Sequence, residues 1–124
     1  MHRILLIEDD EPLRKMIRKV LERAGYEVQE APNGKIGLKL YSEQPSELIV
    51  TDLIMPEKEG LETIMEFRRL AAGVKIIAMS GGNRMNPKVN LAMAQKFGAA
   101  RTLAKPFSHQ DILEAVAEVL EKRT

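Results

Sequence analysis

Short apolar runs and amphipathic stretches alternate along the chain, and this alternation constrains the fold more than any other feature of the sequence. Residues 4–7, 48–50 and 74–79 form largely apolar runs of the kind found in buried parallel strands. Residues 27–30 and 101–104 are more mixed in character. We therefore predict strands in all five segments, with the two mixed ones nearer the edges of a sheet.

Between these runs, apolar residues recur at the spacing that lines one buried face of a helix. The stripes are Leu13, Ile17, Val20, Leu21 and Ala24; Leu61, Ile64, Met65 and Phe67; Val89, Met93 and Phe97; and Ile112, Val116, Val119 and Leu120. A further helix is expected over roughly 35–42, ending near Pro45. The sequence therefore predicts strands and helices in strict alternation.

Residues that favour helix ends support these boundaries. Residue pairs and triplets suited to a helix start are Asp10 with Glu11 and Pro12, Asn86 with Pro87, and Ser108 with Asp111. Glycines suited to a left-handed helix end are Gly25, Gly73 and Gly98. Five βα units of this kind predict an α/β fold, a doubly wound five-stranded parallel sheet with helices on both faces. No linker or repeat interrupts the pattern, so one domain is expected over residues 1–124.

Composition excludes several classes of function. The formal net charge is only +1, which argues against a nucleic-acid or membrane surface acting through bulk charge. The chain has no cysteine, so thiol catalysis and cysteine-ligated metals are excluded. No apolar run approaches the roughly 18 residues of a membrane span. We expect a cytoplasmic protein.

Reactive side chains follow the predicted strands. Glu8, Asp9 and Asp10 come after the first strand, and Asp52 comes after the third. The fourth predicted strand is followed by Ser80-Gly81-Gly82 and the fifth by Lys105-Pro106. Because the carboxyl ends of parallel strands form the ligand edge of such a sheet, these groups are expected to converge there.

Clustered carboxylates repel one another unless a cation lies between them. Their oxygens suit Mg²⁺, and a metal ion, an ammonium and a hydroxyl are the groups needed to hold a phosphoryl group. The alternative is a purely structural salt-bridge network between Lys105 and the acids. A stable fold has no need of three clustered acids, so we favour the phosphoryl site.

At these residues the sequence resembles the receiver domain of two-component response regulators, over essentially all 124 residues. The motifs that carry the resemblance are residues 4–10, residues 51–56 with Gly60, Ser80-Gly81, and Lys105-Pro106-Phe107. The resemblance implies a flavodoxin-like receiver fold. It also implies a phosphoprotein of phosphorelay signal transduction, which catalyses only its own phosphorylation and dephosphorylation and is otherwise not an enzyme.

The resemblance also implies a role for each site residue. Asp52 would be the phosphoacceptor, taking the group from a sensor histidine kinase or a phosphotransfer protein. The implied ligands of Mg²⁺, or of another divalent cation such as Mn²⁺, are Asp9, Glu8 mainly through water, Asp52 and the backbone carbonyl of Ile54. The implied phosphoryl-binding groups are the Ser80 hydroxyl and the Lys105 ammonium, aimed by a cis Lys105–Pro106 peptide bond.

The sequence departs from the family pattern in three places, one of which is that Ile54 and Gly82 offer no polar side chain to orient a hydrolytic water. Family members commonly carry an aromatic residue three positions before the lysine, where this chain has Thr102. In the family, the signal passes through coupled movement of the hydroxyl residue and this aromatic residue. The alternative for this chain is that the signal passes through movement of the backbone or of a helix. Residues 81–86 are expected to form a longer, glycine-containing loop before the predicted fourth helix.

The favoured function is a switch that signals to a downstream protein target, without direct nucleic-acid or membrane binding. The first rival is a phosphorylation-independent interaction module with the same fold. The second is a metal-dependent phosphohydrolase, which usually needs a second acid beside the nucleophile. Leu53 and Ile54 do not supply that acid. Met1 and the polar C-terminal end of the chain favour a stand-alone receiver over one part of a longer chain.

Overall fold

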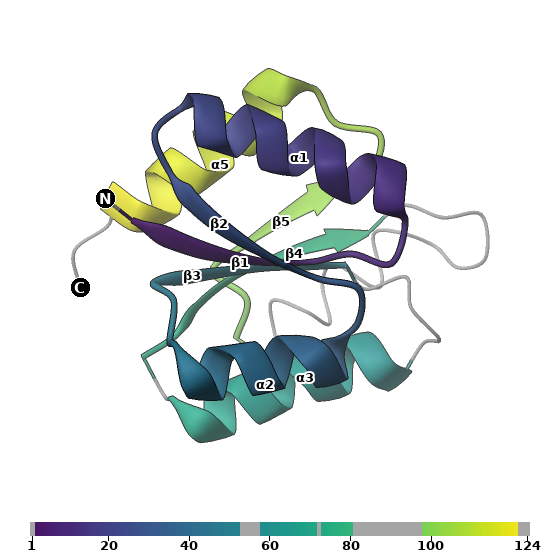
Figure 1. Ribbon diagram of the computed structural model, residues 1–124, viewed down its shortest axis with the longest axis vertical. Helices are drawn as coiled ribbons and strands as arrows, with labels where there is room; N and C mark the ends of the chain where they lie inside the picture. The colour runs from purple at the N-terminus through teal and green to yellow at the C-terminus, as the bar shows by residue number, and fades with distance from the viewer. Residues whose placement is uncertain (1, 53–57, 72, 81–97, 122–124) are drawn as a thin grey trace.

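The computed structural model describes residues 2–52, 58–71, 73–80 and 98–121 (Figure 1). The strands are β1 (Arg3–Ile7), β2 (Glu27–Ala31), β3 (Leu48–Asp52), β4 (Lys75–Ser80) and β5 (Arg101–Ala104). The helices are α1 (Glu11–Arg23), α2 (Gly34–Glu43), α3 (Lys58–Leu70) and α5 (His109–Glu121). The predicted alternation of strands and helices is confirmed in these segments, while the predicted helix carrying Val89, Met93 and Phe97 lies outside them.

The five strands form one parallel sheet in the order β2-β1-β3-β4-β5. The order reverses direction after β2, which makes the sheet doubly wound, as predicted. The mixed segments β2 and β5 are the two edge strands, and the three apolar strands lie between them. An edge strand has one neighbour instead of two, so it tolerates the polar residues that a central strand excludes.

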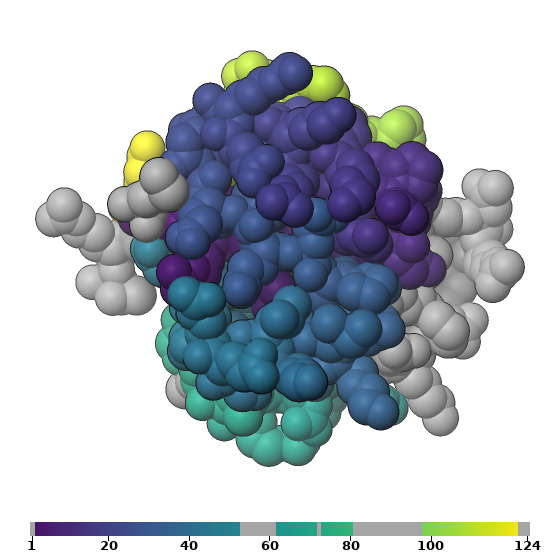
Figure 2. Space-filling view, in the orientation of Figure 1, coloured from purple at the N-terminus to yellow at the C-terminus, as the bar shows by residue number. Residues whose placement is uncertain are grey.

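Helices cover both faces of the sheet. Figure 1 shows α1 and α5 on one face and α2 and α3 on the other. Alternate residues of β1 point into the two layers: Ile4 and Leu6 pack with α1 and α5, whereas Leu5 and Ile7 pack with α2 and α3. In the space-filling view of the same orientation, the blue side chains of the α1–β2–α2 part of the chain cover most of the visible face (Figure 2).

The predicted helix ends at Asp10, at Ser108 with Asp111, and at Gly25 are confirmed. The Asp10 carboxylate accepts a hydrogen bond from the Leu13 N–H at 3.4 Å and caps α1. Ser108 and Asp111 form the reciprocal capping box at the start of α5, with both bonds at 3.0 Å. Gly25 and Gly98 adopt left-handed backbone angles, with φ of 97° and 111°. The predicted starting pair Asn86 and Pro87 lies outside the described residues.

Three details differ from the sequence-based expectation. Gly73 is not left-handed, because α3 already ends at Leu70 and the Val74 N–H closes a turn onto the Ala71 carbonyl at 3.1 Å. Met65 is 41% exposed, because it is rotated roughly 100° along the helix from the buried Ile64. Ala24 is exposed at the cap of α1, just beyond its buried stripe.

Within the described ranges, no helix is both long and apolar enough to cross a membrane.

Candidate functional site

The carboxyl ends of the central strands bring the predicted site residues together. Asp52 and Ser80 are the last residues of β3 and β4, so the strands extend further than the sequence predicted. Glu8 follows β1 directly and Lys105 follows β5 directly. Because Ile7 lies opposite Thr51 in the β1–β3 register, Glu8 continues that register beside Asp52.

Lys105 joins the two buried acids. Its Nζ donates a hydrogen bond to Glu8 Oε1 at 2.8 Å and to Asp52 Oδ2 at 3.3 Å. The Glu8 and Asp52 side chains are only 1% and 2% exposed, and the lysine side chain is 18% exposed. The Lys105–Pro106 bond is cis, as the resemblance implied. One ammonium therefore serves two carboxylates in a largely dehydrated setting.

Two buried carboxyl groups and one ammonium lie in contact in this cluster, and their pKa values are shifted as a result. Burial, and then the neighbouring Asp52 carboxylate, raise the pKa of Glu8 from 4.5 to about 8, although the Lys105 ammonium opposes this rise. Burial alone would lower the pKa of Lys105, but its hydrogen bond with Glu8 and the charges of Asp52 and Glu8 raise it. The cluster therefore retains its ammonium firmly and disfavours ionisation of Glu8.

The donor set fits a small divalent cation. One carboxylate oxygen from each of Glu8, Asp9 and Asp52 lies within 4.8 Å of the other two. Glu8 and Asp52 are buried and Asp9 is exposed, so the oxygens span the boundary between the core and solvent. Carboxylate oxygens placed this way, with room for water on one side, are what Mg²⁺ prefers. A cation there would also offset the repulsion between the acids.

Ser80 and Lys105 are neighbours through the backbone. The Lys105 N–H donates a hydrogen bond to the Ser80 carbonyl at 2.7 Å, and Ser80 is 1% exposed. Thr102 lies in the edge strand β5 opposite Ala78 and is half-buried. The predicted carbonyl ligand Ile54 and the predicted loop 81–86 lie outside the described residues.

One contact at the site was missed by the sequence analysis. Arg14 on α1 donates from Nη1 to the backbone carbonyl of Glu8 at 2.9 Å, and from Nε to Glu30 Oε1 on β2 at 2.9 Å. No motif marks these residues, since an arginine on an amphipathic helix and a glutamate on an edge strand are both ordinary surface choices. Only the tertiary arrangement of α1 and β2 brings them to the site.

Comparison with known proteins gives a single family. Residues 4–117 match the family described as the response regulator receiver domain. The response regulator receiver protein CpdR of Brucella abortus is 33% identical over 122 residues, which cover 97% of this chain and 98% of CpdR. The sensor kinase CckA of the same organism is 34% identical over 122 residues, which cover 97% of this chain and 13% of CckA.

Solved structures agree with the sequence comparisons. A CheY-like response regulator receiver domain protein from Methanospirillum hungatei superimposes with a TM-score of 0.84 at 30% identity, covering 98% of this chain and 94% of that one. The family match extends over most of the chain and includes the acidic edge and all of the sheet except Arg3. The chain belongs to the response regulator receiver domain family.

Proposed function

We propose that Asp52 accepts a phosphoryl group from a phosphohistidine on a sensor histidine kinase or a phosphotransfer protein. One observation carries this proposal: Glu8, Asp52 and Lys105 meet at the carboxyl edge of the sheet in direct contact, with Asp9 beside them. A carboxylate oxygen of Asp52 would form the new O–P bond while the N–P bond of the phosphohistidine breaks. The departing imidazole then takes up a proton.

The other side chains would hold the incoming charge. Lys105 already contacts Asp52, so its ammonium needs little movement to pair with a phosphoryl oxygen. The Ser80 hydroxyl would donate to another oxygen, because the adjacent strands place it one residue beyond the Asp52–Met79 pair of the β3–β4 register. Pro106 would maintain the lysine's direction, and Thr102 would line the neighbouring strand.

A divalent cation, Mg²⁺ or Mn²⁺, would be held by Asp9, Asp52 and the Ile54 carbonyl, and by Glu8 through water. When bound, it would neutralise the crowded acids and the developing charge on the phosphoryl oxygens. The protein supplies the geometry by keeping two of the acids buried and fixed. The chain acts on no metabolite in this scheme and catalyses only its own phosphorylation and dephosphorylation.

The signal would pass through changed binding to a downstream protein target, in the cytoplasm and without direct contact with nucleic acid or membrane. In this scheme residues 1–124 would act as a single receiver unit. Matches to both a small receiver protein and part of a sensor kinase support a unit that works with histidine kinases.

Acetyl phosphate labelling tests the proposal. The wild-type protein should form an acid-stable, base-labile adduct, with a mass increase of one phosphoryl group, only when Mg²⁺ is present. Asp52→Asn should abolish it. Asp10→Asn is the matched control, since Asp10 lies near the cluster but caps α1, and asparagine caps equally well. Equal labelling of the Asp52→Asn protein would refute the assignment. No labelling of the wild type would favour the phosphorylation-independent interaction module.

A further inference from the structure

The backbone of Glu8 is hydrogen-bonded at both its N–H and its carbonyl, at the point where β1 ends and the acidic edge begins. Its N–H donates to the Ala31 carbonyl of β2 at 3.1 Å. Its carbonyl accepts from Nη1 of Arg14 at 2.9 Å. A carbonyl just beyond the end of a strand has left the sheet ladder, so a side chain must satisfy it if it is shielded from water. Arg14 provides that donor.

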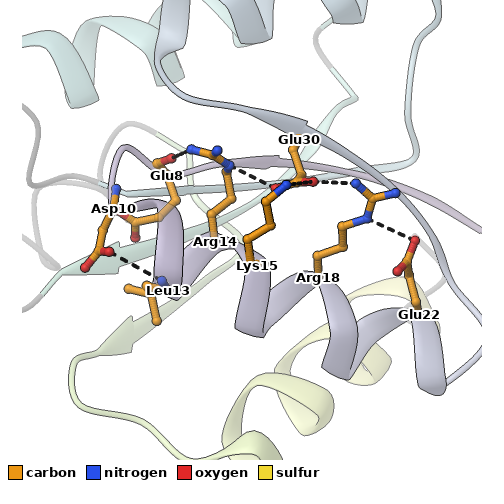
Figure 3. A network of polar contacts seen from close by, with 8 residues as sticks. All are labelled: Glu8, Asp10, Leu13, Arg14, Lys15, Arg18, Glu22 and Glu30. Atoms are coloured by element: carbon orange, nitrogen blue, oxygen red, sulfur yellow. Dashed lines mark hydrogen bonds and ion pairs between the residues drawn. The ribbon is translucent and has the colours of Figure 1, made fainter.

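Arg14 is itself anchored on β2. Its Nε donates to Glu30 Oε1 at 2.9 Å, and the two side chains are only 13% and 11% exposed. Figure 3 shows the guanidinium lying between the Glu8 carbonyl and the Glu30 carboxylate. Lys15 at 3.4 Å and Arg18 also pair with Glu30, but neither has a described contact with Glu8. The arginine fork is suited to such a double contact because its donors are rigidly spaced.

This brace acts on the part of the backbone that separates two of the acids. The Glu8 carbonyl belongs to the peptide that joins Glu8 to Asp9, so its orientation sets where the Asp9 side chain starts. On the far side of Asp9, the Asp10 N–H donates to Glu8 Oε2 at 3.2 Å. The relative placement of the Glu8 and Asp9 carboxylates therefore depends on how this peptide is held.

We propose that Arg14 is a positioning residue for the divalent cation: by bracing the Glu8 carbonyl against Glu30, it holds the Glu8 and Asp9 carboxylates at the spacing that binds the metal. The inference rests on the proposed function, because it assumes that these acids bind a cation. It adds Arg14, a residue of α1 outside the acidic cluster, whose role is to orient the metal ligands.

Simple electrostatics predicts the opposite sign, which makes the inference testable. Arg14 carries a positive charge close to a proposed cation site, so removing that charge alone should tighten cation binding. Loss of the brace should weaken it, because the carboxylates are then no longer preorganised. The sign of the change in affinity therefore separates positioning from charge.

The experiment is a calorimetric titration with Mg²⁺ of the wild type, Arg14→Gln and Arg18→Gln. Arg18 is the matched control because it also pairs with Glu30 and also lies on α1, without a described contact at the acidic edge. We expect Arg14→Gln to weaken Mg²⁺ binding by about tenfold. Arg18→Gln should leave the affinity unchanged or slightly tighter. Circular dichroism confirms that each protein is folded at the titration temperature.

Glu30→Gln completes the test as a double-mutant cycle. If the contact with Glu30 holds Arg14 in position, Glu30→Gln should weaken Mg²⁺ binding in the wild-type background. It should have little further effect on that affinity in the Arg14→Gln background. Should Arg14→Gln fail to fold, Arg14→Lys replaces it. Lysine keeps the charge but lacks the forked donors, so binding weaker than wild type supports the brace and wild-type binding overturns it.

Amide resonances give a readout that does not require the metal. In metal-free protein, Arg14→Gln should shift the Asp9 and Asp10 amide signals much more than Arg18→Gln does. Unchanged or tighter Mg²⁺ binding by Arg14→Gln would overturn the positioning role alone. Absence of Mg²⁺ binding by the wild type would overturn both this role and the metal part of the proposed function.

Discussion

Glu8 and Glu30 both have largely buried carboxyl groups, and Arg14 on α1 contacts both residues, yet the surroundings of the two carboxyl groups are opposite. Glu8 shares one ammonium, that of Lys105, with Asp52. Glu30 is alone among three cations: Arg14, Lys15 and Arg18. Acid is in excess in the first cluster and base in the second. Among the described residues, the fold therefore forms an acid-rich cluster, Glu8 and Asp52 with Lys105, and a satisfied cluster, Glu30 with its three cations. Arg14 contacts both Glu8 and Glu30, and Figure 3 shows this link.

The two pKa values move in opposite directions as a result. Burial, with the adjacent Asp52, raises the pKa of Glu8 to about 8. Burial also tends to raise the pKa of Glu30, but hydrogen bonds from Arg18, Arg14 and Lys15 overcome this tendency and lower it. Burial alone thus does not decide the state of a carboxylate; the balance of partners does. A cluster in which the described carboxylates outnumber the ammonium groups is the one suited to bind a cation.

The largest expected effect on stability comes from the satisfied cluster. Glu30→Gln should lower the free energy of unfolding by about 2 kcal/mol, because it leaves the mostly buried Arg14 with a weaker, uncharged acceptor. Urea unfolding in EDTA, followed by circular dichroism, measures the change. Glu22→Gln is the control, since Glu22 pairs with Arg18 in solvent. Equal losses from the two substitutions would show that Glu30 is only another surface acid.

The acid dependence of this difference is the next effect in size. The folded pKa of Glu30 lies below the unfolded value of 4.5, so its stabilisation is fully present above about pH 4.5 and is lost as the pH falls through the folded value. Wild type and Glu30→Gln should therefore differ most above about pH 5 and converge in more acidic solution. Parallel unfolding curves at every pH would contradict the lowered pKa.

The stability of the acid-rich cluster should depend on pH with the opposite sign. The folded pKa of Glu8 lies above its unfolded value of 4.5, so the metal-free wild type should lose stability as the pH rises from 4.5 toward about 8. Glu8→Gln removes this acid while leaving Lys105 paired with Asp52. We expect it to be neutral near about pH 5 and more stable than wild type by about 1 kcal/mol near about pH 9.

Urea titrations in EDTA across this pH range measure the effect. A conservative control is Asp10→Asn, which changes an exposed carboxylate two residues from Glu8. It should leave the pH dependence of the unfolding free energy unaltered. If Glu8→Gln instead destabilised the protein at every pH, the Glu8–Lys105 pair would be a net support of the fold, and the contrast with Glu30 would fail.

The sequence predicted the acid-rich cluster better than the satisfied one. The proximity of Asp52, Ser80 and Lys105 could be predicted because the ends of parallel strands meet at one edge of the sheet. The Arg14–Glu30 pair depends on how α1 lies across β2, which no local pattern specifies. The same limit explains Met65: its helix was predicted, but the phase at the margin of the buried stripe depends on neighbouring elements. The prediction that Gly73 is a left-handed helix end was also wrong, since α3 ends at Leu70.

The smallest expected effect separates partners within the satisfied cluster. Lys15 pairs with Glu30 at 3.4 Å, but its side chain is 51% exposed, whereas that of Arg14 is 13% exposed on the same acid. Lys15→Gln should change the free energy of unfolding by less than about 0.5 kcal/mol, since solvent screens an exposed pair and the lysine chain regains freedom. Urea unfolding of Lys15→Gln and of Arg14→Gln under the same conditions measures the loss of unfolding free energy that each substitution causes. A loss from Lys15→Gln as large as that from Arg14→Gln would mean that Glu30 is stabilised by the summed charge around it. A clearly larger loss of stability from Arg14→Gln would mean that the shielded Arg14–Glu30 hydrogen bond stabilises Glu30 more than the summed charge does. The same arginine also contacts the Glu8 carbonyl at the acidic edge.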